Sequence, residues 1–380
     1  MRLALVGLGN AGFQIHLPAL AGMASIAVVG ACDPDTARRE RAAATYRVPT
    51  FTDFDAMLAE SRPDVVVIGT PPDSHADYCL RAFAAGAHVV CEKPFVSSLA
   101  EADVVLTAAA RAGRRVALNH EFREMPIFRA LRDELARPGA GELVFVQIWQ
   151  LMDLPPWAEP GWRGRMLQRT LYEAGVHLVD FLMALFGEKP VSVQASTSTC
   201  GVRDEATDAV ALVTLEFSRG RLAHVTQNRL CKGETQYFEV RADTTDASLR
   251  ASFGGRARLS TGLFRDTKPH ARFEYGISGL AWKEVGNRRT FLARNPKAPA
   301  VVATRFVFEK TFEAFRTGGR PPASGEDGRD VLEVIAACYH SAATGRRLRL
   351  DDPDVQSLAT LRMGAPPDAA MPDALGSRLG

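Results

Sequence analysis

The chain has 380 residues, and this length predicts two domains because a single hydrophobic core rarely grows so large. Hydrophobic residues make up 46% and charged residues 24%, as in soluble globular proteins, and a formal net charge of +2 gives no electrostatic case for binding nucleic acid or a membrane. Six widely spaced cysteines without a C-x-x-C pair argue against a disulfide framework or a metal site and favour a cytoplasmic location.

The first 120 residues alternate between short apolar runs and helical patterns. The apolar runs predict strands at 2–6, 25–31, 64–69, 87–91 and 115–119. Helices are expected between them at about 11–22, 35–45, 53–60, 74–85 and 98–112. This alternation is typical of a doubly wound, parallel α/β sheet, in which ligands bind at the carboxyl ends of the strands. Residues 1–120 are therefore expected to form a domain of the Rossmann type.

A glycine loop follows the first predicted strand and precedes the first predicted helix. The pattern G-x-G-x-x-G is common by chance, but between a strand and a helix it is typical of dinucleotide-binding folds. Its glycines permit a tight turn and a close approach of the backbone to a pyrophosphate, which the helix N-terminus also attracts. The alternative is a glycine turn in an unrelated α/β protein. We expect the phosphates of a dinucleotide to bind at Gly7, Gly9, Asn10, Ala11 and Gly12.

Asp33 lies 21 residues beyond Gly12, directly after the second predicted strand. Dinucleotide folds place an acidic residue at about this position to bind the ribose hydroxyls, where it repels a 2′-phosphate. The position of Asp33 therefore predicts NAD as the cofactor. Arg38 and Arg39 in the next helix leave NADP as an alternative, because an arginine can bind a 2′-phosphate. We expect both side chains to face solvent instead.

The regular alternation of strand and helix patterns ends after residue 120. Residues 121–350 predict a second, α+β domain with antiparallel strands between about 191 and 261. Helices are expected at about 122–137, 170–186, 302–317 and 326–344, and one strand at 142–152. Residues 263–299 show little periodicity and are expected to be irregular. Residues 351–380 close the chain as a separate segment, of which the part from 363 onward looks loose.

A possible proton acceptor lies on the helix predicted at 170–186. Glu173 and His177 are four residues apart, which places both side chains on one face of an α-helix, and Asp180 lies one turn further along. A carboxylate beside an imidazole fixes its tautomer and raises its basicity, which suits a general base near neutral pH. A surface ion pair is the simpler alternative. The rest of this helix is apolar, however, so its polar groups require partners.

Two motifs are specific: Glu92-Lys93-Pro94 and the Gly-Val-His-x-x-Asp sequence at 175–180. Through these motifs the chain resembles the glucose–fructose oxidoreductase/inositol 2-dehydrogenase (Gfo/Idh/MocA) family. Other matching stretches occur in family order at 7–12, 32–35, 70–75, 123–126 and 323–328. The resemblance covers roughly residues 1–350.

This resemblance implies a Rossmann domain followed by a domain with an open, mostly antiparallel sheet that often makes oligomer contacts, here in a homodimer or homotetramer. It also implies NAD(P)-dependent oxidation or reduction of a polyol, cyclitol or sugar-like molecule. Lys93 would then hydrogen-bond the reacting hydroxyl and His177 would take its proton. Two departures affect the site: Glu173 replaces the family's usual Asp, and residues 168–170 replace a Gly-Gly stretch.

Further candidates flank these motifs. Near the cofactor we expect Thr70, Pro71, His75, Glu92, Lys93 and Asn119. A helix cap is the alternative for His75, and a salt bridge is the alternative for Glu92. Near the substrate we expect His120, Arg123, Trp162 and Arg163; Glu121 could also reach it, and an interdomain ion pair explains Glu121 and Arg123 equally well. Trp149, Trp157 and Trp162 surround a proline-rich segment, and core packing is the alternative to a substrate rim.

Three functions are compatible with these features. The leading interpretation is an NAD(P)-dependent dehydrogenase that acts on a secondary alcohol. The second is a hydrolase or lyase of the same family that recycles tightly bound NAD without net release of NADH. The third is a cofactor-binding sensor without catalysis, for which only Glu173 and the altered loop argue.

Overall fold

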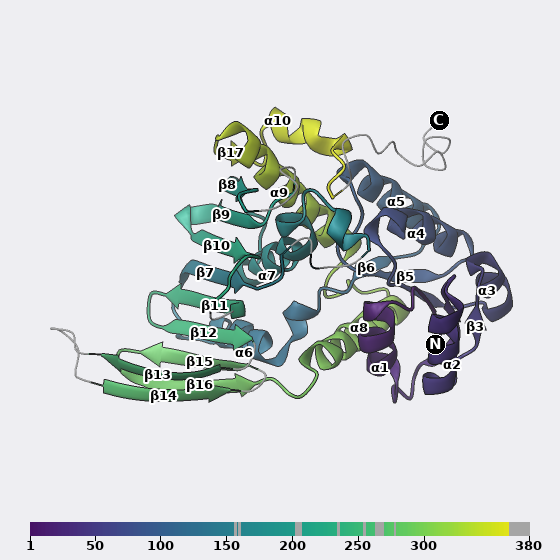
Figure 1. Ribbon diagram of the computed structural model, residues 1–380, viewed down its shortest axis with the longest axis horizontal. Coiled ribbons are helices and arrows are strands. Elements are labelled where there is room, and N and C mark those ends of the chain that lie inside the picture. Colours follow the sequence, from purple (N-terminus) through teal and green to yellow (C-terminus); the bar gives the residue numbers. More distant parts are fainter. Residues whose placement is uncertain are drawn as a thin grey trace.

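The computed structural model describes residues 1–155, 158, 161–201, 207–233, 236–253, 256–262, 270–276 and 279–364. Two units lie side by side, each built around its own sheet (Figure 1). No described helix has both the length and the apolar character that crossing a membrane requires.

The first unit contains a six-stranded sheet in which every neighbouring pair is parallel. Its order, β3-β2-β1-β4-β5-β6, is the order of dinucleotide-binding sheets and confirms the doubly wound fold. The short strand β3 was not expected from the sequence. The strands are β1 (Arg2–Val6), β2 (Ala27–Cys32), β3 (Thr50–Phe51), β4 (Val65–Ile68), β5 (His88–Cys91) and β6 (Val116–Leu118).

Three helices of this unit begin at side-chain caps that the sequence supplies. Asp35, Asp53 and Ser98 each accept a hydrogen bond from the backbone N–H three residues later. The helix after the glycine loop is irregular, because a π-helical turn, η1 (Gly12–His16), leads into α1 (Leu17–Leu20). The remaining helices are α2 (Thr36–Tyr46), α3 (Phe54–Ser61), α4 (His75–Ala84) and α5 (Leu99–Arg111).

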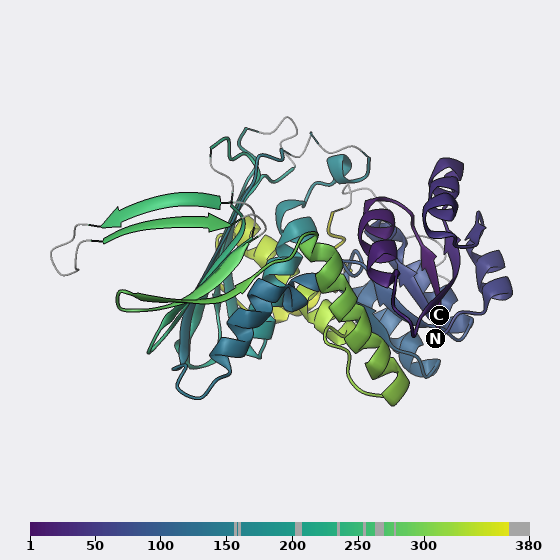
Figure 2. The ribbon, with the colours of Figure 1, turned by 90° about the horizontal axis from the view of Figure 1, so that it is seen from below.

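The second unit contains a nine-stranded sheet that confirms the open, mostly antiparallel expectation. Its order is β16-β15-β12-β11-β7-β10-β9-β8-β17, and only the β7–β10 pair is parallel. The strands are β7 (Leu143–Leu151), β8 (Ser192–Ser198), β9 (Val210–Glu216), β10 (Leu222–Asn228), β11 (Gln236–Thr244), β12 (Ser248–Phe253), β15 (Leu280–Val285), β16 (Arg288–Arg294) and β17 (Leu348–Arg349). A separate hairpin, β13 (Arg256–Gly262) and β14 (His270–Gly276), extends away from this sheet (Figure 2).

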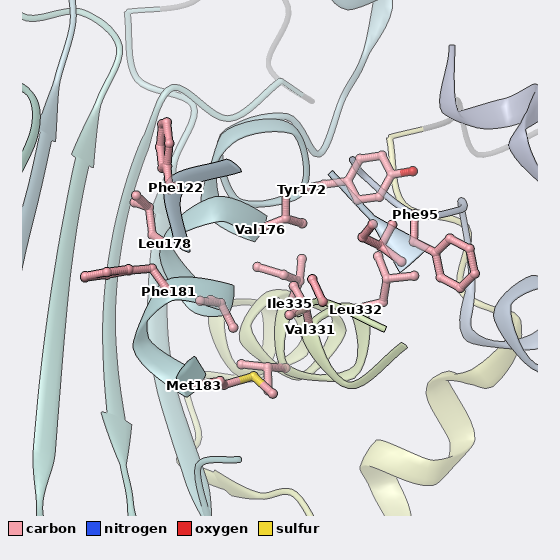
Figure 3. Packing of buried hydrophobic residues seen from close by; sticks show 14 of the residues in the cluster. Phe95, Phe122, Tyr172, Val176, Leu178, Phe181, Met183, Val331, Leu332 and Ile335 are labelled. Atoms are coloured by element: carbon pink, nitrogen blue, oxygen red, sulfur yellow. The ribbon is translucent and has the colours of Figure 1, made fainter. Parts of the chain in front are cut away.

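Helices cover one face of the nine-stranded sheet. They are α6 (Pro126–Leu135), α7 (Val176–Phe186) and α9 (Gly325–Thr344). Apolar side chains of α7, including Val176 and Phe181, meet those of α9, including Ile335, in a shared core (Figure 3). Phe122, which follows the last strand of the first unit, packs into the same core. The two units therefore share one hydrophobic cluster rather than touching only through polar surfaces.

The expectation of an irregular segment at 263–299 is wrong for the part that the structure describes. β15 and β16 form a hairpin there, and β16 is the edge strand of the sheet. Its side chains are mostly exposed, so it lacks the alternation of apolar and polar residues that marks a half-buried strand. Charged pairs across the strands replace that pattern, since both Arg250 and Arg289 contact Glu284.

Two late segments return to the first unit. Helix α8 (Pro299–Thr317) lies in the range expected for the second domain, yet it runs beside α1 (Figure 1). Its Phe308, Phe312 and Phe315 pack into the core formed by residues of β1 and α1. Residues 351–364 begin the segment expected to be partly loose, and two of them, Val355 and Met363, are buried. Residues 351–364 form α10 (Pro353–Gln356) and η8 (Ser357–Thr360), and the N–H of Met363 donates to Ser97 O at 2.8 Å. Residues 365–380 lie outside the described part.

Candidate active site

The glycine loop lies at the carboxyl end of β1 and fits a dinucleotide pyrophosphate. Gly7 has φ +93°, and a Cβ there would lie 2.6 Å from the backbone of Gly69; a Cβ on Gly12 would lie 2.0 Å from Gly7 O. Both positions therefore require glycine. A Cβ on Gly9 would have Arg38 Nη1, at 3.9 Å, as its nearest neighbour, so the backbone there is open. Open backbone at the start of a helix is what phosphate oxygens require.

Asp33 is buried at the end of β2 beside this loop. Its Oδ2 accepts a hydrogen bond from Leu8 N at 2.8 Å, and its Oδ1 accepts one from Asp35 N at 2.9 Å. Neither arginine of α2 simply faces solvent: Arg38 Nη1 lies 3.5 Å from Asp33 Oδ2, and Arg39 Nη1 donates to Asp33 O at 2.7 Å. The ribose position expected at Asp33 is thus bordered by an acid and by a half-exposed guanidinium.

Glu92 is the centre of a buried polar cluster at the ends of β5 and β6. Its Oε1 lies 2.6 Å from His16 Nε2 and accepts a hydrogen bond from Asn119 Nδ2 at 2.7 Å, while its Oε2 accepts from Lys93 N at 3.1 Å. Burial raises the pKa of Glu92, but its bonds to His16 and Asn119 and the charge of Lys93 outweigh this effect and lower the pKa to about 2. His16 has no signal in the sequence, because only the π-helical turn and the tertiary fold bring it to Glu92.

Thr70, Pro71 and His75 form the loop and helix start that follow β4. The His75 ring is fully buried, and its nitrogens contact three backbone carbonyl oxygens, those of Thr70, Pro94 and Phe95, at 2.8–3.0 Å. His75 therefore joins the loop after β4 to the Lys93-Pro94 loop. This differs from the expected cofactor contact, because protein groups already occupy both ring nitrogens.

Lys93 is held by the second unit. Its Nζ donates to Glu173 O at 3.1 Å and lies 3.5 Å from Glu173 Oε1. The same carboxylate contacts Arg163 Nε at 3.3 Å and Arg229 Nη1 at 3.5 Å. Burial raises the pKa of Glu173, but the charges of Lys93, Arg229, Arg163 and Arg169 outweigh burial and lower it to about 2. Glu173 is thus a fixed negative charge that orients Lys93. Arg229 and Arg169 had no sequence signal.

The expected pairing of Glu173 with His177 is not formed. Residues 170–175 form a π-helical turn, η6 (Thr170–Gly175), whose hydrogen bonds run from residue i to i+5. Residues four apart then no longer lie above one another, so Glu173 turns toward the cations. Asp180 likewise does not contact His177; it binds Arg123 through two hydrogen bonds of 2.7 and 2.5 Å.

His177 is buried among residues that follow β6. Its ring stacks on Phe122 with centroids 4.4 Å apart, and the ring of His120 lies 6.1 Å away, edge-on. Burial, assisted by the charges of Lys93 and His120, holds the pKa of His177 well below its usual value. The carboxylate nearest to its Nδ1 in the described contacts is Glu121, whose Oε2 lies 3.9 Å away. The imidazole is therefore neutral near pH 7, as a proton acceptor must be.

The residues expected near the substrate divide into two groups. Arg123 and His120 are internal: Arg123 is held by Asp180, and His120 Nε2 lies 3.7 Å from the same carboxylate. The ion-pair alternative is thus the one that the structure favours for Arg123. Trp162 and Arg163 stay near the site, with the Arg163 guanidinium 4.3 Å from the Trp162 ring centroid. Trp149 is half-buried on β7, and Trp157 lies outside the described residues.

Comparison with known proteins agrees with this geometry. The family described as "Oxidoreductase family, NAD-binding Rossmann fold" matches residues 1–120, and the GFO/IDH/MocA C-terminal domain matches residues 128–249. The chain belongs to the Gfo/Idh/MocA family. It is an NAD(P)-dependent oxidoreductase with an NAD-binding Rossmann fold.

Individual members of the Gfo/Idh/MocA family resemble the chain over nearly its whole length. D-apiose dehydrogenase from Paraburkholderia graminis is 26% identical over 94% of this chain and 91% of that protein. Inositol 2-dehydrogenase from Rhizobium meliloti is 25% identical over 92% and 99%. An Agrobacterium radiobacter oxidoreductase, solved with NAD⁺, L-tartaric acid and magnesium, has the same fold, with a TM-score of 0.78. It is 19% identical over 92% of this chain and 98% of that chain.

Among the described residues of this chain, no cluster of His, Cys, Asp and Glu is arranged to hold a metal ion.

Proposed function

We propose that the protein interconverts a secondary alcohol and a ketone of a sugar, cyclitol or sugar-derived molecule, using NAD. The observation that carries this proposal is the contact between the two units: Lys93, at the carboxyl end of the sheet that carries the glycine loop, donates to Glu173, four residues before His177. The charge of Lys93 also helps to lower the pKa of His177. The relatives named D-apiose dehydrogenase and inositol 2-dehydrogenase support a polyol or sugar as the substrate class.

Each residue of the junction has a separate role in this proposal. Lys93 hydrogen-bonds the reacting oxygen, and Glu173 holds the ammonium group in place for that contact. His177 takes the hydroxyl proton, which its low pKa permits because the ring is unprotonated before the reaction. NAD, when bound, exchanges the hydride. Trp162 and Arg163 border the same place and are proposed to contact the substrate, since the Arg163 side chain keeps about a third of its surface exposed.

The test is turnover of a panel of polyols, sugars and sugar acids, followed by NADH absorbance with NAD⁺ present. Net NADH formation that depends on the alcohol is the expected result. Cofactor that stays bound through purification, with a substrate bond cleaved and no NADH released, would show the NAD-recycling chemistry instead. Tight cofactor binding without any turnover would show a sensor.

We also propose a homodimer or homotetramer assembled through the face of the nine-stranded sheet that no described helix covers. Leu212 and Leu222 are 43% and 41% exposed on β9 and β10. The register places Leu212 opposite Thr226, and Thr226 opposite Trp149, so a row of leucine, threonine and tryptophan side chains crosses three strands. A Leu212→Glu variant should dissociate the assembly, as light scattering after size-exclusion chromatography will measure. A wild-type protein that elutes as a monomer contradicts this proposal.

A further inference from the structure

Glu121 places a carboxyl group against the inner nitrogen of His177. It opens the short helix η3 (Glu121–Glu124) directly after β6, and its side chain is 12% exposed. Its Oε2 lies 3.9 Å from His177 Nδ1, so a shift of about 1 Å closes a hydrogen bond. Within the described residues, Nδ1 of His177 is buried and makes no hydrogen bond. The inner nitrogen of the proposed base therefore faces one acid.

The surroundings of Glu121 favour its protonated form. Burial is the largest cause of the raised pKa of Glu121, and the negative charges of Glu92 and Asp180 raise this pKa further. The positive charge of Lys93 acts in the opposite direction. Together they raise the pKa of Glu121 from 4.5 to about 8. An acid with such a pKa changes its charge within the pH range in which a dehydrogenase exchanges protons with its substrate.

In the described structure, the ion pairs that α6 and α8 make with η3 go to Glu124 rather than to Glu121. Tyr237 of β11 is near enough for the charge of Glu121 to raise the pKa of Tyr237. A neutral phenol, however, does not neutralise the charge of a carboxylate. On α8, Thr304 contacts Asn119 and Lys310 binds Glu124. His120, beside Glu121 in the chain, faces Asp180. The group that Glu121 can exchange a proton with is therefore His177.

We infer that Glu121 positions His177 and exchanges a proton with its Nδ1 while Nε2 exchanges a proton with the substrate hydroxyl. This inference rests on the proposed function. In the oxidising direction the carbinol hydrogen leaves with its electron pair to NAD⁺, and the hydroxyl proton moves to Nε2. The Nδ1 proton moves to the Glu121 carboxylate, so the substrate is oxidised, NAD⁺ is reduced and the released proton is stored on Glu121. Reduction runs the same transfers backwards.

The relay assigns to Glu121 the part that the sequence suggested for Glu173. Glu173 is bound to Lys93, Arg163 and Arg229 and stays ionised, so it has no proton to exchange. Glu121 is bound to no described cation. Glu173 therefore orients Lys93, and Glu121 exchanges a proton with His177.

The first test is the pH profile of kcat/KM for the alcohol at saturating NAD⁺. In the wild type it should rise through an ionisation near 8 and then level, because oxidation needs an ionised Glu121. Glu121→Gln should lose this ionisation and lower kcat about 10–100-fold, while Glu121→Asp should keep the ionisation. Glu309→Gln, a change at an exposed acid of α8, serves as the matched control. A Glu121→Gln enzyme with the wild-type profile overturns the inference.

The second test does not depend on turnover. The infrared difference between wild type and Glu121→Gln should show a protonated carboxyl band near neutral pH that disappears around pH 8. A carboxyl already ionised at about pH 6 overturns the inference even in an active enzyme. A wild-type protein that turns over nothing on the panel, yet shows this band, contradicts the proposed function and leaves the protonated Glu121 established.

Discussion

The ammonium group of Lys93 lies 3.1 Å from the backbone carbonyl oxygen of Glu173 and 3.5 Å from its carboxylate. The lysine leaves the end of β5 in one unit, and the glutamate belongs to η6 in the other. This contact joins the two units four residues before His177. The position of the lysine therefore depends on the folding of the second unit, and a change at Glu173 is expected to reach both proposed catalytic residues.

Replacing either proposed catalytic residue should reduce the rate without loss of the fold. Lys93→Met removes the donor to the reacting oxygen, and His177→Gln removes the proton acceptor. Each should lower kcat by about 10²–10⁴-fold while NAD still binds. Steady-state kinetics and a fluorescence titration of NAD will measure both quantities. Lys297→Met and His340→Gln, at sites on other surfaces, are the matched controls. Near-normal kcat in His177→Gln would rule out the proposed base.

Glu173→Gln should destabilise the protein near neutral pH. It leaves Lys93 and Arg229 without their shared carboxylate, and we expect a loss of roughly 3 kcal/mol in the free energy of unfolding. The pKa of Glu173 is lowered from 4.5 to about 2, so its contribution is complete above pH 4.5 and is lost as the pH falls toward 2. Urea unfolding at several pH values should show the variant and the wild type converging in acid. A difference that is constant with pH contradicts this assignment.

Glu121→Gln should show the opposite pH dependence. The pKa of Glu121 is raised from 4.5 to about 8, so its contribution to stability is complete below pH 4.5 and is lost as the pH rises through 8. Glutamine copies the neutral acid and does not titrate. The variant should therefore match the wild type near pH 5 and melt a few degrees higher near pH 9. Thermal unfolding followed by circular dichroism will test this, and a variant that is less stable at both pH values counts against a protonated Glu121.

The choice between NAD and NADP should depend on Asp33 and Arg38 in opposite ways. Asp33→Ser removes the charge that repels a 2′-phosphate, and we expect the preference for NAD to fall about 10-fold or more. Arg38→Ala removes the guanidinium 3.5 Å from Asp33 and should weaken NADP more than NAD. Titration of both cofactors against the wild type and both variants gives the ratios. Tighter binding of NADP than of NAD by the wild type would overturn the assignment of NAD as the preferred cofactor.

Some of these features follow from short stretches of sequence. Gly7 and Gly12 are required by local backbone geometry, and the burial of β1, β4 and β5 on both faces appears in the sequence as apolar runs. The edge strand β16 could not be recognised in this way. A strand that buries few of its side chains does not need apolar and polar residues in alternation. Helix α8 was recognised as a helix, but no local pattern indicates which sheet an amphipathic helix covers.

The sequence by itself determined the helices of the first unit and its strands other than β3, the glycine loop, Asp33 and the family motifs around Lys93 and His177. It did so because these features depend on residue type at fixed local spacing. Only the tertiary structure decided which charges meet: Glu173 with Lys93, His16 with Glu92, and Glu121 with His177. The two π-helical turns shift side chains off the spacing of an α-helix, and contacts between residues up to 80 positions apart then select their partners.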